Sequence, residues 1–147
     1  MSDQINPKRA QIVAEAQTWL GTKYHHQGRV KGAGVDCAML LIEVYHRLGL
    51  IPDIDPRPYP HDWHFHRDDE RYLGWVKQYA KPVDVPMPGD VVLFQFMRCV
   101  SHGAIVVQWP QVIHSYVTEG VVLADASSGV LGKRVRGFYS LIDEGTL

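Results

Sequence analysis

Residues 28–50, GRVKGAGVDCAMLLIEVYHRLGL, pass from a glycine-rich turn to a single cysteine and then to an apolar stretch with helical period. Gly49 follows that stretch and ends the predicted helix, as glycine commonly does. The residues that recur on one face of this helix are Leu40, Leu41, Val44, Tyr45 and Leu48. The pattern predicts a buried helix with Cys37 in its first turn.

The position of Cys37 suits a nucleophile. The thiolate is the reactive form of cysteine, and the unpaired N–H groups and partial positive charge of a helix N-terminus favour it. The same N–H groups can stabilise the oxyanion that forms when the sulfur attacks a carbonyl. The alternative is a buried cysteine that packs as a small hydrophobe. The small residues of the preceding segment, GAGVD, leave the sulfur approachable and favour the nucleophile.

A cysteine nucleophile needs a base, and histidine is the side chain whose pKa suits that role near neutral pH. Of the eight histidines, His102 and His114 each lie in an otherwise apolar predicted strand, where an imidazole needs a polar partner. The two can partner each other if they share one face of a hairpin. A loop of only Trp109 and Pro110 would place them on opposite faces, so we predict an odd-length loop or a bulge.

The rest of the chain predicts an α+β fold with N-terminal helices packed on a C-terminal antiparallel β-sheet. Asn6 and Pro7 begin a first helix that ends before Gly21, and a third helix is expected at about residues 68–79. The predicted apolar face of the first helix is Ile12, Val13, Ala16, Trp19 and Leu20. The later segments DVVLFQF, HGAIVVQW, QVIHSY, GVVLAD and RVRGFYSL are short, β-branched or aromatic, and separated by turn residues. We expect one domain over residues 1–147.

Composition excludes several classes of partner. Lys and Arg number 15 against 16 Asp and Glu, so no basic field attracts nucleic acid. The N-terminal residues 1–20 contain no continuous apolar run, so we expect neither a signal peptide nor membrane insertion. Two cysteines are too few for a disulfide framework, and free thiols are expected.

Four segments, GVDCAML, PGDVVLF, SHGAIVV and VIHSY, together resemble the NlpC-type cell-wall cysteine peptidases of the papain-like clan. Those proteins have Asp-Cys at a helix start, a Gly-Asp strand, a strand histidine and a later strand histidine. The order of the motifs and the twelve-residue separation of the two histidines are the same here. The resemblance implies a papain-like fold with Cys37 as nucleophile, His102 as base and His114 as the residue that orients the base.

The resemblance also implies roles for two residues before the cysteine. Tyr24 matches an aromatic residue near the oxyanion site, and Asp36 matches a carboxylate that holds the free amine of a murein peptide. Ordinary packing for Tyr24 and a helix N-cap for Asp36 are the structural alternatives, and the N-cap can coexist with amine binding. Ala38 and Met39 replace the usual Ser-Gly after the nucleophile, which leaves the details of the substrate pocket open.

The resemblance implies hydrolysis, without a cofactor, of an amide bond in the peptide stem of peptidoglycan, at the D-glutamyl-diaminopimelate bond. The segment HDWHFHRDDERYLGWV and the lack of an export signal resemble the phage tail-associated subgroup. Such a protein is made in the bacterial cytoplasm, binds other tail-tip proteins, and acts at the cell wall or periplasm after delivery by a virion or phage-like particle. The alternative is a catalytically silent tail-tip protein that keeps the fold.

A zinc site is the competing interpretation of the same side chains. The ligands would be Cys37, Cys99, His102 and His114, or the histidines of HDWHFH, which are His61, His64 and His66. Structural zinc normally takes closely spaced ligand pairs, and in the first set only Cys99 and His102 have that spacing. We therefore expect no metal, and we expect Cys99 to be a strand-end or loop residue.

Overall fold

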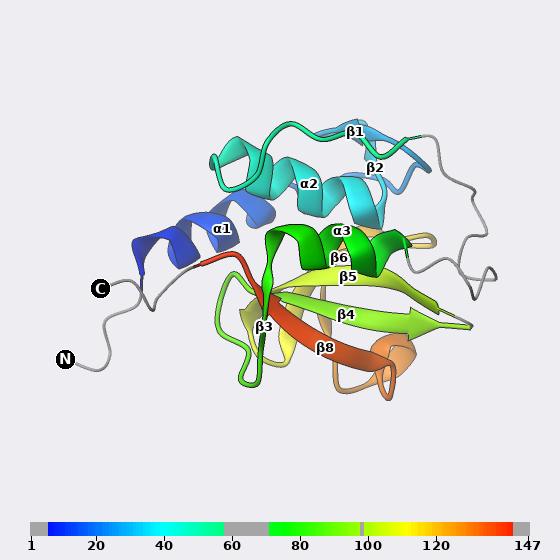
Figure 1. Cartoon of the computed structure of the whole chain (residues 1–147). Helices are drawn as coiled ribbons and strands as arrows, with labels where there is room; N and C mark the ends of the chain where they lie inside the picture. The colour runs from blue at the N-terminus through cyan, green and yellow to red at the C-terminus, as the bar shows by residue number, and fades with distance from the viewer. Residues whose placement is uncertain (1–5, 58–70, 98, 143–147) are drawn as a thin grey trace.

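The computed structural model describes residues 6–57, 71–97 and 99–142, and it places three helices on one face of a six-stranded antiparallel sheet (Figure 1). The helices are α1 (Pro7–Gln17), α2 (Cys37–Arg47) and α3 (Arg71–Tyr79). The α+β architecture predicted from the sequence is confirmed.

The sheet has the strand order β3-β8-β4-β5-β6-β7. Its strands are β3 (Lys81–Val83), β4 (Val91–Phe96), β5 (Cys99–Gln108), β6 (Gln111–Tyr116), β7 (Gly120–Asp125) and β8 (Val135–Ser140). The last strand in the chain, β8, therefore lies between β3 and β4. Proline is tolerated in β3 because that strand is at the sheet edge. A 3₁₀ turn, η2 (Gly129–Leu131), follows β7.

The region between the first two helices is more ordered than the sequence indicates. It contains a short hairpin of β1 (Arg29–Val30) and β2 (Gly34–Val35), where the sequence indicates only a glycine-rich turn. Val35 also forms an isolated bridge with Tyr24. This arrangement brings the loop before α2 against the start of that helix.

Helix α1 begins as predicted but ends early. The Asn6 side chain accepts a hydrogen bond from the backbone N–H of Lys8 at 2.9 Å, and Pro7 is the first helical residue. The helix ends at Gln17, and Leu20, predicted on its buried face, is 43% exposed. The Gly21 N–H donates to the Val121 carbonyl of β7, so the chain has already turned toward the sheet.

A buried ion pair joins α1 to the PGD turn before β4. The Arg9 guanidinium lies 2.7 Å from the Asp90 carboxylate, and both side chains are almost fully buried. Arg9 also donates to the Pro88 carbonyl at 3.0 Å, and the second Asp90 oxygen accepts from the Met87 N–H at 2.9 Å. Gly89, which lies between Pro88 and Asp90 in the chain, has a φ of +91°, which glycine adopts without strain. The Gly-Asp of this motif therefore fixes the first helix to the sheet.

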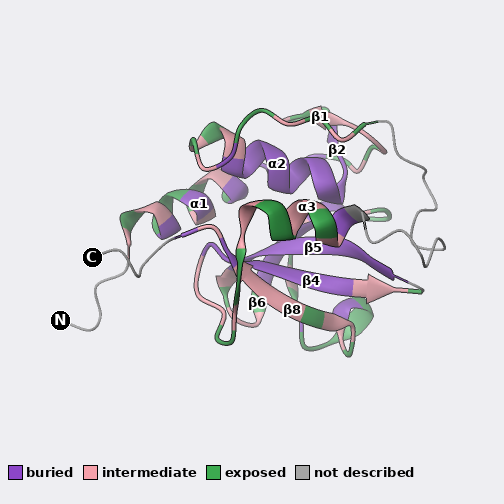
Figure 2. Cartoon of the chain, in the orientation of Figure 1, coloured by how far each residue is buried: buried purple, intermediate pink, exposed green. Residues whose placement is uncertain are grey.

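Helix α2 is the centre of the main hydrophobic core. Its residues from Cys37 to Tyr45 are all buried, and the buried colour covers most of the helix in Figure 2. It packs with α1, α3 and one face of the sheet, whereas a second core cluster that includes Val92, Phe94 and Val106 lies on the other face. The N-terminus of α2 is consequently held in place by a packed core.

The register of the β5–β6 hairpin places His102 and His114 on the same face of the sheet, as their pairing requires. Val106 pairs with Val112 but Gln108 pairs with Gln111, so Val107 is an extra residue in β5. This bulge shifts the register by one residue beside a two-residue turn. The predicted odd loop or bulge is confirmed.

Candidate active site

The two strand histidines form a direct hydrogen-bonded pair. The Nε2 atom of His102 lies 2.7 Å from the Nδ1 atom of His114. Both residues are buried, with exposed fractions of 6% and 1%. His102 also pairs across the sheet with Phe94, which belongs to the second core cluster. The imidazole pair therefore lies on the sheet face that the helices do not cover.

Aromatic side chains enclose this pair. Phe94, Phe96 and Tyr116 have ring centroids within 6.1 Å of the His102 ring, and Tyr116 stacks on His114. Burial lowers the pKa of His102 well below its usual value, with a smaller contribution from His114, and burial lowers the pKa of His114 to about 4. Both imidazoles are thus neutral near pH 7, and one nitrogen of the shared bond carries its proton.

Helix α2 meets the sheet where β5 and β6 separate. The paired segment of the two strands ends at Ile105. Beyond that point, the Cys37 thiol donates to the Ser101 carbonyl at 3.7 Å, and the Gly103 N–H lies within hydrogen-bonding reach of the sulfur. Ser101 and Gly103 flank His102, so the sulfur lies against the backbone on both sides of the histidine.

The ionisation of Cys37 differs from our expectation for a helix N-terminus. Burial raises the pKa of the thiol, and the neighbouring Asp36 carboxylate raises it further. The N–H groups of Gly103 and Ala38 and the hydroxyl of Tyr72 lower the pKa, but they do not outweigh burial. The helix start supplies the expected donors, and the thiol is nevertheless neutral in the resting site.

Tyr24 lies close enough to the nucleophile to interact with it electrostatically. Burial raises the pKa of its phenol, with smaller contributions from Cys37 and Asp36. Its bridge with Val35 holds it next to the residues that precede α2. Tyr24 therefore presents a protonated hydroxyl, a hydrogen-bond donor, near the sulfur.

Asp36 is the N-cap of α2. One carboxylate oxygen accepts from the Met39 N–H at 2.9 Å, and the other accepts from the Gln27 N–H at 2.7 Å. His26 lies 3.9 Å from the second oxygen. Asp36 thus has the structural role of an N-cap, and amine binding by the same carboxylate stays a prediction.

The family model for NlpC/P60 proteins matches residues 21–140, which include the cysteine, both histidines and all but the first helix. The chain belongs to the NlpC/P60 family. Among curated proteins, none matches this sequence.

Solved NlpC/P60 structures share the fold at low sequence identity. A family protein from Bacillus cereus superposes with a TM-score of 0.66 at 19% identity over 88% of this chain, which spans 39% of that protein. The NlpC/P60 domain of the peptidoglycan hydrolase SagA has a TM-score of 0.60 at 23% identity and is matched over 99% of its length, with 92% of this chain covered. RipD from Mycobacterium tuberculosis, a non-catalytic NlpC/P60 protein adapted to peptidoglycan binding, has a TM-score of 0.54 at 11% identity, with 92% of this chain and 97% of RipD covered.

The competing zinc interpretation gains no support from the described part of this NlpC/P60 chain. There, no group of three or more His, Cys, Asp or Glu side chains is arranged to hold a metal ion. Cys99 forms no disulfide and is the first residue of β5, in agreement with the prediction that it lies at a strand end or in a loop. His61, His64 and His66 lie outside the described residues. None of the described helices has the length and apolar character needed to span a bilayer.

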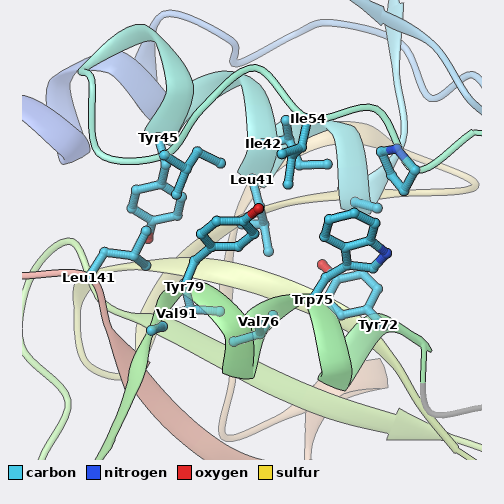
Figure 3. Close-up of a pocket in the computed structure, with 14 residues that line it drawn as sticks. Leu41, Ile42, Tyr45, Ile54, Tyr72, Trp75, Val76, Tyr79, Val91 and Leu141 are labelled. Atoms are coloured by element: carbon cyan, nitrogen blue, oxygen red, sulfur yellow. The ribbon is translucent and has the colours of Figure 1, made fainter.

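Sequence reasoning missed the contribution of α3 to the site. Tyr72 on that helix donates to the Cys37 carbonyl at 3.4 Å and borders an apolar pocket between α2 and α3 (Figure 3). The same pocket is lined by Leu41 and Tyr45 of α2 and by Trp75 of α3. The sequence alone does not indicate this contact, because the contact depends on how α3 packs.

Proposed function

We propose that this NlpC/P60 chain is a cysteine peptidase that hydrolyses an amide bond in the peptide stem of peptidoglycan. The observations that carry the proposal are the 2.7 Å bond between His102 and His114 and the contact of the Cys37 thiol with the carbonyl of Ser101, the residue before His102. A pair of neutral, mutually bonded imidazoles provides a base and a residue that orients it. A fold-only role gives no physical reason to bury such a pair.

In the proposed reaction, His102 accepts the Cys37 proton as the sulfur attacks the scissile carbonyl. A neutral thiol and a neutral imidazole make this proton transfer part of the attack step. The N–H groups at the start of α2 and the Tyr24 hydroxyl stabilise the resulting oxyanion. His102 then protonates the leaving amine, the C–N bond breaks, and an acyl-enzyme remains on the sulfur.

Water completes the cycle by the reverse proton path. His102 removes a proton from the water, the hydroxide adds to the thioester carbon, and the C–S bond breaks with return of a proton to the sulfur. In the tautomer that serves this path, His102 donates from Nε2 to Nδ1 of His114, which leaves its own Nδ1 as the basic atom. His114 therefore orients the base, and no cofactor takes part.

The family resemblance supports a specific bond, between D-glutamate and diaminopimelate. In this part of the proposal Asp36 attracts the free amine of the stem peptide while it caps α2. The proposed amine contact is additional to the two backbone hydrogen bonds that the carboxylate accepts. Digestion of stem peptides with a free or an acetylated amine tests the contact, because acetylation removes the charge that Asp36 would bind.

Incubation with purified peptidoglycan sacculi tests the proposed activity. The expected result is the appearance of new free amines and shorter stem peptides, detected by mass spectrometry. The Cys37→Ala variant, incubated in the same way, should release neither product. If the wild-type protein binds sacculi but releases nothing, the chain is a catalytically silent, peptidoglycan-binding member of the family. That second candidate is kept because RipD combines this fold with a non-catalytic role.

We also propose, on the sequence resemblance alone, that the chain acts as part of a phage or phage-like tail. There it contacts other tail-tip proteins and reaches the cell wall or periplasm with the particle, after synthesis in the bacterial cytoplasm. Purified particles from the source strain should contain the chain at a fixed ratio to tail proteins. Its presence only in the secreted, particle-free fraction would contradict this delivery route.

A further inference from the structure

Tyr72 reaches the nucleophile from a helix that the proposed mechanism does not use. Its side chain is only 4% exposed, and its hydroxyl lies 3.4 Å from the Cys37 carbonyl. The same hydroxyl lies close enough to the Cys37 side chain to lower the pKa of the thiol. In Figure 3 Tyr72 projects from α3 at the end of the pocket occupied by Trp75.

The residue after His102 makes room for this phenol. A Cβ at Gly103 would lie 2.5 Å from the Tyr72 hydroxyl oxygen and 2.9 Å from a methyl carbon of Leu41. Only the absence of a side chain at this position lets the hydroxyl approach the strand so closely. Gly103 also supplies a backbone N–H to the sulfur, so strand and helix converge on the same atom.

We propose that the Tyr72 hydroxyl is a further catalytic group: as the Cys37 thiolate forms, the hydroxyl turns its proton from the Cys37 carbonyl to the sulfur and stabilises the charge. The proposal rests on the proposed peptidase function for its catalytic meaning. The hydroxyl already lies at Cys37 in the protein without substrate, so its effect on the thiol can be tested separately.

The surroundings of the sulfur explain why such a donor matters. Burial and the Asp36 carboxylate both oppose formation of the thiolate. The donors that counter them are two backbone N–H groups and the Tyr72 hydroxyl. Among the described residues, the titratable groups of the candidate site include Asp36 at the start of α2, Tyr24 in the preceding loop, Tyr72 on α3, and His102 and His114 from the sheet. Among the donors, Tyr72 is the one that a side-chain substitution removes.

The test compares Tyr72→Phe with Tyr45→Phe in the full chain. Tyr45 is a matched control because it is also buried, lines the same pocket, and donates to a backbone carbonyl, that of Gly89, at 2.7 Å. Iodoacetamide alkylation of Cys37, resolved from Cys99 by mass spectrometry, is followed from neutral to mildly alkaline pH. The reagent reports the thiolate fraction and requires no peptidoglycan.

Tyr72→Phe should slow alkylation about tenfold at a fixed pH below the thiol midpoint, because one lost charge-assisted hydrogen bond raises the thiol pKa by about one unit. Tyr45→Phe should leave the rate within about twofold of the wild type. Cleavage by Tyr72→Phe should show a lower kcat with a similar KM, and the deficit should persist over this pH range because burial holds the pKa of the Cys37 thiol above it. A purely structural loss would be shared by Tyr45→Phe.

An unchanged alkylation rate in folded Tyr72→Phe would overturn the proposal, and so would equal slowing in both variants. If Tyr72→Phe does not melt like the wild type, Tyr72→Met tests the same missing hydroxyl with a side chain that still fills the pocket. Wild-type protein that cleaves no peptidoglycan but shows the expected alkylation difference would refute the peptidase function and leave the Tyr72 contact standing.

Discussion

His102 and His114 are joined Nε2 to Nδ1 at 2.7 Å, although they lie twelve residues apart and on neighbouring strands. The single extra residue at Val107 makes this possible, because it places both side chains on one face of the sheet. Without the bulge the two rings would face opposite sides, and each would be a buried imidazole in need of another partner. The bulge is therefore part of the candidate active site.

Loss of either reacting group should abolish cleavage. Cys37→Ala and His102→Ala should each lower kcat/KM for stem peptides by at least about 10⁴-fold, because members of a nucleophile–base pair act as a unit. Amine release measured by mass spectrometry, with circular dichroism to verify the fold, gives the comparison. Cys99→Ala removes the other buried thiol and should cleave normally. Wild-type turnover by either site variant would refute the mechanism.

Replacement of His114, the orienting histidine, should lower the activity less than replacement of His102. His114→Ala should lose roughly ten- to a hundredfold less activity than His102→Ala, because the third member of a triad acts through the base and water can partly replace it. Steady-state kinetics on one stem peptide ranks the variants. Equal losses in His114→Ala and His102→Ala would instead give His114 a direct part in proton transfer.

Much of this site could be predicted because its parts follow local rules. The apolar period after Cys37 predicts the helix, and the predicted thiol position proved to be the first residue of α2. The need of His102 and His114 for a polar partner predicted their pairing and the parity of the hairpin. These inferences use short-range spacing and the cost of burying polar groups, which the sequence records directly.

The features that escaped prediction depend on long-range packing. The end of α1 at Gln17 is followed by a backbone bond between Gly21 and Val121 of β7, one hundred residues away in sequence. The raised pKa of Cys37 follows from how deeply α2 is buried, which no local pattern reports. The Tyr72 hydroxyl reaches Cys37 only because α3 packs against the strand at a glycine.

Acid should destabilise the fold through His114. Burial lowers its pKa to about 4, below the usual value of about 6.5. The unfolded chain therefore takes up a proton between these two values while the folded chain does not. His114 should account for a loss of about 3 kcal/mol as the pH falls through this window, and no further loss below it.

Urea unfolding across that pH range measures the effect, with His114→Gln as the comparison because glutamine does not titrate. The free energy of unfolding of His114→Gln should depend less on pH than that of the wild type. Parallel curves for the two proteins would mean that His114 does not carry this part of the acid sensitivity.

The buried ion pair between Arg9 and Asp90 should contribute to stability only as an intact pair. Asp90→Ala removes the carboxylate that lies 2.7 Å from the buried Arg9 guanidinium, so it should lower the free energy of unfolding by about 3–5 kcal/mol. Asp55→Ala is the matched control, because its pair with Arg57 is solvent-exposed and should cost no more than about 1 kcal/mol. Adding Arg9→Met to Asp90→Ala should recover part of the loss, since the buried positive charge is then gone. Urea titrations of the variants give the comparison, and a double variant no more stable than Asp90→Ala would show that the buried charge is not the source of the penalty.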